Sequence, residues 1–155
     1  MYIDDSLQYK VIGKTTNGAF QALWLEIEFK TKSNITCGVV YRQHNSADRF
    51  LDHFEESIGH YSASSKPVYL LGDVNINILR SQTCGYAQQF LNCLQSYALL
   101  PTFDKSTRVY KDSSSLIDNI FLNIFEDYSV SGNIVSDVID HFSQFCILKS
   151  IVEIA

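Results

Sequence analysis

The sequence lacks the features that would assign it to several special classes of protein. Its 155 residues contain no run of about 18 apolar residues, and its start, MYIDDSLQYK, has no signal-peptide pattern. No low-complexity segment or charge run divides it, and only 2 prolines interrupt it. Lys and Arg number 12 against 17 Asp and Glu, for a net charge of −5, which excludes a global positive field for nucleic acid. We therefore expect a soluble intracellular protein, nuclear or cytoplasmic, that is not secreted and has no transmembrane segment.

The cysteines also lack a recognisable spacing. The 4 cysteines are Cys37, Cys84, Cys93 and Cys146, and they form no CxxC pair or other zinc-binding spacing. This pattern excludes a zinc module and argues against a disulfide scaffold. We expect buried free thiols in a reducing compartment.

Apolar and aromatic residues, by contrast, are plentiful. Hydrophobic residues make up 46% of the sequence, aromatic residues 13% and charged residues 19%. A chain of this length and composition folds as one globular domain with a substantial core, and not as a disordered tail. We expect a single unit over residues 1–155.

Strand patterns occupy the first and last thirds of the chain. The early ones are YKVI, ALWLEIEF and ITCGVVY, between residues 9 and 41. The late ones are TRVY, SLIDNIFLNIF, YSVSGNIVS and FSQFCILKSIV, between residues 107 and 152. Because turn-forming residues separate these runs, we expect hairpins, with the first three strands as a meander.

Two helical patterns flank one buried strand in the middle of the chain. Residues 46–60 and 85–99 carry apolar side chains at helical spacing, and VYLL (68–71) is typical of a strand buried on both faces. This mixture of hairpins and helical connections favours an α/β or α+β sandwich with helices outside the sheets.

Polar residues interrupt or end the apolar strands at four places, which form the candidate site. Each place lies at or near a strand end, where side chains from different strands can meet in a pocket. The four segments are Tyr41-Arg42, Gly72-Asp73-Val74-Asn75, Ser115-Leu116-Ile117-Asp118 and Asp140-His141.

The GDVN segment allows two interpretations. Asp73 offers an anionic acceptor and Asn75 a neutral donor and acceptor on the same side of the chain, so the pair could hold a phosphate or its attacking water. The same four residues also form a common turn in which the aspartate caps the backbone. The segment alone does not separate the two.

Asp118 indicates a functional contact more clearly than the GDVN segment does. It lies inside the apolar run LIDNIFL, where a carboxylate is costly unless it is paired. His141 is the partner we expect, because a neighbouring carboxylate orients an imidazole and stabilises its charged form.

Five other candidates have plain structural interpretations. His44, His53 and His60 have no acidic partner implied by spacing, and we expect them to be solvated. Taken singly, Tyr41 is typical of a half-buried strand tyrosine and Arg42 of a surface cation.

The order of the motifs resembles that of the endonuclease/exonuclease/phosphatase (DNase I-like) superfamily. GVVYRQHN, VYLLGDVNIN, TRVYKDSSSLIDNIFLN and DVIDHFSQFCIL are similar to the YRPPN-like, GDFN, T…S.IDHIF.N and SDHFP motifs of apurinic-type endonuclease domains from non-LTR retrotransposons. The resemblance extends from ALWLEIEF to FCIL. It implies a four-layered α/β sandwich of two mostly antiparallel sheets flanked by helices. It also implies DNA nicking by metal-dependent phosphodiester cleavage, in a domain that accompanies a reverse transcriptase.

The resemblance implies a role for each matching residue. Asp73 would orient or deprotonate the attacking water, and Asn75 would help to hold the phosphate and the nucleophile. Asp118 would orient His141, which would hydrogen-bond the phosphate and stabilise its growing charge. Tyr41 would contact the scissile phosphate.

The metal site is where the sequence departs from the family pattern. The resemblance implies Asp140 and Asp73 as ligands of Mg²⁺ or Mn²⁺, yet family members also use an asparagine on the first strand and a glutamate on a later one, and neither has a counterpart here. Ile139 and Val74 also replace the Ser of SDH and the Phe of GDFN. We therefore expect a partial domain without its amino-terminal strands, its first sheet incomplete, with weak metal binding and little activity.

Three functions stay open. The first is a DNA-nicking endonuclease of a retrotransposon-derived protein, and the second a catalytically inactive nucleic-acid-binding or interaction remnant of the same fold. The third is a phosphatase or sphingomyelinase-like relative, which the motif order and the missing membrane-binding segment disfavour. DNA is the expected substrate, with no membrane and no obligate protein partner. Unpaired strands would favour self-association through an exposed sheet.

Overall fold

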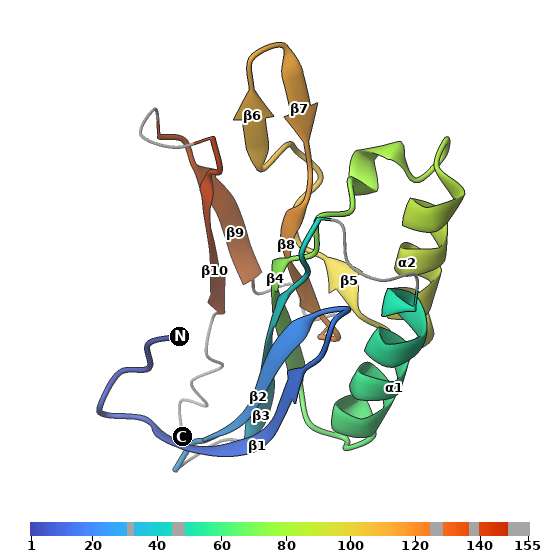
Figure 1. Ribbon diagram of the computed structural model, residues 1–155. Helices are drawn as coiled ribbons and strands as arrows, with labels where there is room; N and C mark the ends of the chain where they lie inside the picture. The colour runs from blue at the N-terminus through green and yellow to red at the C-terminus, as the bar shows by residue number, and fades with distance from the viewer. Residues whose placement is uncertain (31–32, 45–48, 125–128, 137–139, 149–155) are drawn as a thin grey trace.

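The main element of the fold is a six-stranded sheet with the strand order β1-β2-β3-β4-β8-β5 (Figure 1). The computed structural model describes residues 1–30, 33–44, 49–124, 129–136 and 140–148. The strands of this sheet are β1 (Gln8–Thr16), β2 (Gln21–Glu28), β3 (Ile35–Tyr41), β4 (Val68–Asp73), β5 (Leu100–Pro101) and β8 (Asp118–Leu122).

The first three strands form the expected antiparallel meander. Strand β3 then pairs with β4 in parallel, which requires a crossover, and helix α1 (Phe50–Ser62) supplies it. The predicted helix over 46–60 thus exists, although residues 46–48 lie outside the described part of the chain. Strand β4 pairs on its other side with β8, antiparallel.

The second predicted helix is α2 (Gly85–Ser96), preceded by the short 3-10 turn η1 (Ile78–Arg80). It ends before residue 99 because Ala98 adopts a left-handed backbone with φ 57°, a common way for a helix to end. Of its predicted apolar stripe, Ala87, Phe90 and Leu94 are buried.

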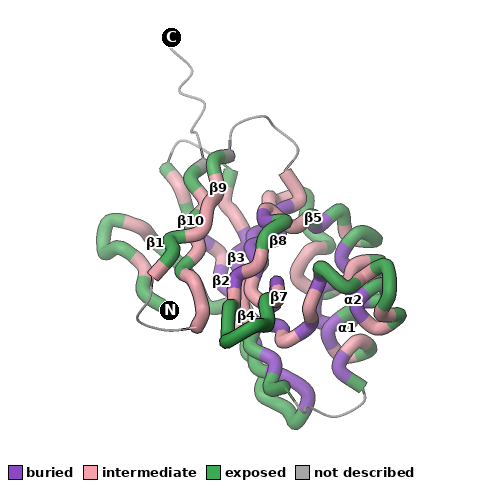
Figure 2. The backbone as a smooth tube through the Cα atoms, turned by 90° about the horizontal axis from the view of Figure 1, so that it is seen from above, coloured by how far each residue is buried: buried purple, intermediate pink, exposed green. Residues whose placement is uncertain are grey.

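Both helices cover the same face of the six-stranded sheet, and the core lies between them (Figures 1 and 2). Four phenylalanine rings are packed at its centre. Phe50 and Phe54 come from α1, Phe90 from α2 and Phe121 from β8, and neighbouring centroids lie 5.0–6.3 Å apart. Aromatic side chains in such contact contribute strongly to burial, so this cluster ties the helices to the sheet.

The opposite face of the sheet carries a two-stranded sheet of β9 (Ser129–Ile134) and β10 (Ser143–Leu148). A second hairpin, β6 (Arg108–Tyr110) and β7 (Ser113–Ser115), projects from one end of the molecule (Figure 1). Helices, a large sheet and a smaller sheet are therefore stacked in layers. This arrangement confirms the predicted α/β class.

The cysteines are free, as expected, but only Cys37 is buried, and the other three are partly exposed. Burial raises the pKa of Cys37 and of Cys93 to about 11, so these two thiols are protonated and unreactive at neutral pH. No helix in the described residues is long and apolar enough to cross a membrane.

Candidate active site

Three of the predicted site residues are placed side by side by strand register. Tyr41 pairs with Asp73 across the parallel strands β3 and β4, and Asp73 pairs with Asp118 across the antiparallel strands β4 and β8. Register partners on neighbouring strands point to the same face of a sheet. The ends of three strands therefore bring these side chains together on the face opposite the helices.

Asp118 has the partner that the sequence indicated. Its Oδ2 lies 3.0 Å from Nδ1 of His141, which precedes β10. The same oxygen accepts a hydrogen bond of 3.0 Å from the hydroxyl of Thr107, a fully buried residue. The Thr107 hydroxyl in turn accepts from the backbone N–H groups of Ile117 and Asp118. The Asp118 carboxylate is thus fixed in position, and it fixes one edge of the imidazole.

A second set of contacts holds the 140–142 segment against β6. The Arg108 Nε donates to Asp140 Oδ2 at 2.8 Å, and the backbone of Val109 donates to the carbonyl of Asp140. The Phe142 N–H donates to the Thr107 carbonyl at 2.7 Å. Sequence reasoning missed Thr107 and Arg108, although Thr107 opens the third motif, TRVYKDSSSLID.

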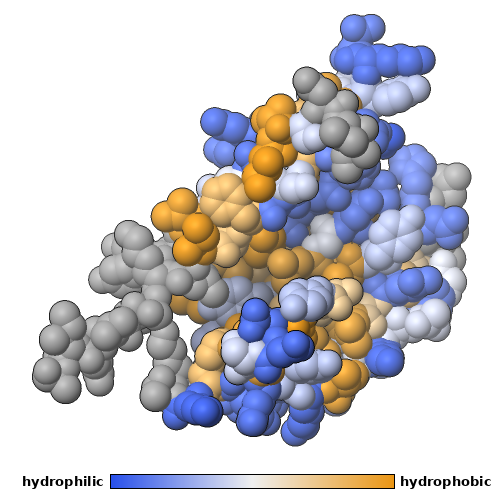
Figure 3. All heavy atoms as spheres, turned by 90° about the vertical axis from the view of Figure 1, so that its left-hand side faces the viewer, coloured by the Kyte–Doolittle hydropathy of each residue, from blue (hydrophilic) through white to orange (hydrophobic). Residues whose placement is uncertain are grey.

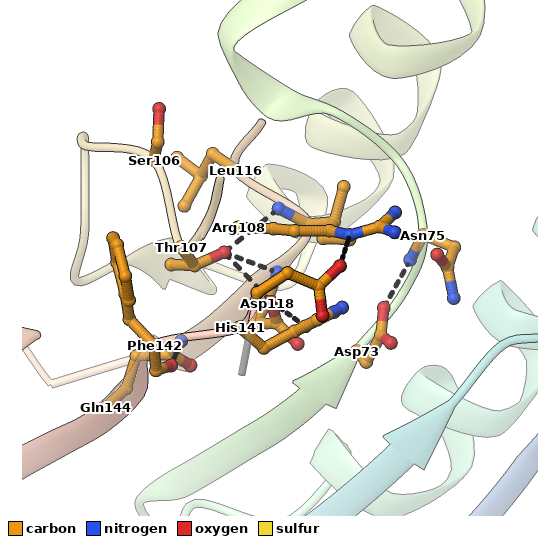
Figure 4. Close-up of polar contacts among 12 residues, drawn as sticks. Asp73, Asn75, Ser106, Thr107, Arg108, Leu116, Asp118, His141, Phe142 and Gln144 are labelled. Carbon is orange, nitrogen blue, oxygen red and sulfur yellow. Dashed lines mark hydrogen bonds and ion pairs between the residues drawn. The ribbon is translucent and has the colours of Figure 1, made fainter. Parts of the chain in front are cut away.

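The GDVN segment forms a capped turn and also faces the site. Asp73 Oδ1 accepts from the Asn75 N–H at 2.9 Å, which is the ordinary capping contact. Asn75 has a left-handed backbone with φ 50°, and its side-chain Nδ2 donates to the Arg42 carbonyl at 2.7 Å. Figure 4 shows Asp73 between His141 and Asn75, with the Asn75 N–H joined to the Asp73 carboxylate. The two interpretations of this segment are therefore compatible.

The environment of Asp73 disfavours its anion. Burial, and then the charge of Asp118, raise the pKa of the Asp73 carboxyl, while the Asn75 N–H and the positive charges of His141 and Arg108 oppose them. A carboxylate with a raised pKa accepts a proton more readily near neutral pH. A nearby cation would stabilise the ionised form of this carboxylate.

Asp73, Asp118 and His141 could together hold a metal ion, because one ligand atom from each lies within 4.8 Å of the others. Asp118 Oδ2 is already used by His141 and Thr107, so Asp73 is the least engaged carboxylate. Asp140 is outside this cluster, and its pairing with Arg108 lowers the pKa of its carboxyl. The prediction that Asp140 is a metal ligand stays a prediction.

Comparisons with known proteins identify the architecture. No family model and no curated protein sequence matches the chain. Among solved structures, the endonuclease domain of TRAS1, a telomere-specific non-LTR retrotransposon, is 16% identical with a TM-score of 0.65 over 83% of this chain. The chain has the endonuclease/exonuclease/phosphatase fold. It spans 61% of that TRAS1 domain.

Two further structures support the same fold. An endonuclease/exonuclease/phosphatase family protein from Leptotrichia buccalis has a TM-score of 0.60 at 16% identity, covering 93% of this chain and 60% of its own. The human Nocturnin catalytic domain has a TM-score of 0.58 at 13% identity, covering 89% of this chain and 58% of its own.

Within this endonuclease/exonuclease/phosphatase fold, a pocket of about 420 Å³ lies beside the GDVN segment. No carboxylate from the described residues lines it. It therefore offers positive charge and hydrogen-bond donors to an anionic ligand. Its polar lining includes Arg42, Arg80, Arg108, His44, Asn75 and Ser115.

The remaining candidates are placed as follows. Tyr41 is half exposed, which agrees with its sequence interpretation and leaves its side chain accessible beside Asp73. His44 and His60 are exposed, as expected, and His53 is partly buried.

The prediction for Arg42 was wrong. Only 8% of this residue is exposed, because α1 and α2 pack over it through aromatic rings.

Proposed function

We propose that this chain provides the catalytic face of a metal-dependent phosphodiesterase that nicks DNA, as in a retrotransposon-derived protein. One observation carries the proposal. Asp73, Asp118 and His141 meet within 4.8 Å at the strand ends of an endonuclease/exonuclease/phosphatase fold, beside Asn75. The pocket without carboxylates beside them suits a polyanionic substrate better than a neutral one.

Asp73 would accept the proton of the attacking water. Its raised pKa suits a general base, and its Oδ1 is held by the Asn75 N–H. The water oxygen would form a bond to phosphorus, and the bond from phosphorus to the leaving sugar oxygen would break, with the sugar oxygen taking up a proton from solvent. Asn75, which lines the pocket, would hydrogen-bond a phosphate oxygen.

His141 would donate a hydrogen bond to the phosphate as negative charge grows on it. The Asp118 carboxylate binds Nδ1, which leaves Nε2 as the atom directed to substrate. Tyr41, accessible beside Asp73, would contact the same phosphate. Thr107 would act through Asp118 by fixing its carboxylate.

A divalent ion, Mg²⁺ or Mn²⁺, would be held at the cluster of Asp73, Asp118 and His141, with Asp118 as the carboxylate ligand while Asp73 acts as the base. When bound, it supplies positive charge that stabilises the phosphate in the transition state. Because Asp118 Oδ2 is already bonded to His141 and Thr107, and Asp73 would serve as the base, these residues leave the ion few free ligand atoms, and we propose that metal binding is weak and cleavage slow.

The test is nicking of supercoiled plasmid with Mg²⁺ or Mn²⁺. The protein should convert plasmid to open circles, and Asp73→Asn or His141→Gln should each slow this about 100-fold or more. Asp52→Asn, which removes an exposed carboxylate on α1, is the matched control and should leave the rate unchanged. DNA binding by the wild-type protein without nicking under either metal would overturn the proposal in favour of an inactive nucleic-acid-binding remnant.

A further inference from the structure

Arg42 is a buried cation that lines the pocket and has no assigned part in the chemical step. It is 8% exposed, and no carboxylate among the described residues lies within ion-pair distance of it. Its Nε is buried without a hydrogen-bond partner. Burying a cation in this way costs stability, so packing alone gives no reason for an arginine at this position.

The guanidinium is held by two aromatic rings. Its Cζ lies 5.0 Å from the ring centroid of Phe50 on α1 and 5.6 Å from that of Tyr86 on α2. Cation–π contacts of this kind compensate part of the lost hydration. The two helices thereby hold the guanidinium next to the GDVN segment.

Arg42 contacts the GDVN segment through both its side chain and its backbone. Nη1 lies 3.4 Å from the carbonyl oxygens of Val74 and Asn75. The Arg42 N–H donates to the Asp73 carbonyl at 2.9 Å, and the Arg42 carbonyl accepts from Asn75 Nδ2 at 2.7 Å. These contacts surround Asn75, whose φ of 50° is unfavourable for a residue other than glycine.

We propose that Arg42 is a positioning residue that holds Asn75 in its left-handed conformation, with its side chain at the pocket wall. The guanidinium anchors the two carbonyls that flank the Cα of Asn75, those of Val74 and Asn75, and the backbone carbonyl of Arg42 fixes the carboxamide. A planar guanidinium that contacts two rings can donate to two adjacent carbonyls at once. A lysine ammonium is not planar and cannot be oriented by the rings in this way. Helices α1 and α2 are thus connected to the site through one side chain.

The first test does not depend on activity. In Arg42→Lys, the side-chain amide resonances of Asn75, assigned by their loss in Asn75→Asp, should shift, and the backbone amide resonances of residues 74–76 should shift with them. Arg42→Met serves as a second variant of similar length without charge. Lys66→Met is the matched control, since it removes a cation that pairs with Glu26 at 2.7 Å near the opposite end of β4. It should leave the Asn75 resonances in place.

The second test rests on the proposed nicking activity. Arg42→Lys should lower kcat at least tenfold, with a smaller change in KM, and ethylguanidine added to Arg42→Ala should restore part of the loss. Unchanged Asn75 resonances in Arg42→Lys, or an equal loss in Lys66→Met, would overturn the proposal. If the wild-type protein does not nick DNA, the proposed function fails, but the resonances of Asn75 still decide the role of Arg42.

Discussion

At the scale of single residues, Asp73 shows a conflict between stability and chemistry. Its carboxylate is partly buried and faces a second carboxylate, Asp118, across the strand pair. The pKa of the Asp73 carboxyl is raised on folding, so its ionised form destabilises the folded protein. The feature that makes Asp73 a suitable base thus lowers the stability of the protein.

This conflict predicts that Asp73→Asn stabilises the protein at neutral pH. A carboxyl whose pKa rises on folding contributes its full stability below its ordinary pKa of 3.8, and this is lost as pH rises through the folded pKa. The carboxamide of the variant could still accept from the Asn75 N–H but carries no charge. The melting temperature of the variant should therefore exceed that of wild type at pH 7, with the difference vanishing near pH 3. A lower melting temperature at pH 7 would contradict the assignment of burial as the dominant cause.

The sequence could indicate some residues of the site and not others. Asp118 was found because a carboxylate inside an apolar run needs a partner, and that argument is local. Arg42 was missed because its burial depends on rings that α1 and α2 bring from 8 and 44 positions further along the chain. The neighbouring residues in GVVYRQHN do not indicate that Arg42 is buried.

At the scale of elements, Gly72 sets the path of β4 into the site. Its φ is 154°, and a Cβ at this position would lie 1.8 Å from the backbone oxygen of Val40 on β3. The close approach of the two strands is what places Asp73 beside Tyr41. Only glycine permits this geometry without moving backbone atoms.

Gly72→Ala should therefore destabilise the protein by about 3 kcal/mol, since it combines an unfavourable backbone angle with a clash against backbone. Urea unfolding followed by circular dichroism would measure the change. Gly18→Ala is the matched control, because a Cβ there meets nothing within 4 Å, and it should change stability very little. Equal effects of the two substitutions would show that the approach of β3 and β4 is not what requires glycine.

At the scale of the whole molecule, the β9–β10 sheet leaves apolar side chains uncovered. Val130 is 49% exposed, Ile147 58% and Phe145 36%, and register places all three on one face of the hairpin. Figure 3 shows hydrophobic side chains gathered on this side of the molecule. Among the described residues, each of the two strands pairs only with the other. An apolar face with unpaired edges favours association with another chain.

We expect this face to cause reversible self-association, as the sequence also suggested. Sedimentation velocity should show the mean mass rising with protein concentration, and Ile147→Lys should reduce that rise by placing a charge on the face. Val109→Lys is the control, because Val109 is also exposed, at 41%, but lies on the β6–β7 hairpin. A monomer at all concentrations, or equal effects of both variants, would refute the expectation.

The sequence by itself determined the α/β class, the meander of β1 to β3, both helices and the pairing of Asp118 with His141. These follow from hydrophobic periodicity and from the cost of an unpaired buried charge, which are properties of short segments. The tertiary structure alone decided the burial of Arg42, the support of Asp118 by Thr107 and the pairing of Asp140 with Arg108. These contacts join residues between 8 and 44 positions apart, and they form only where strand register and helix packing bring their side chains together.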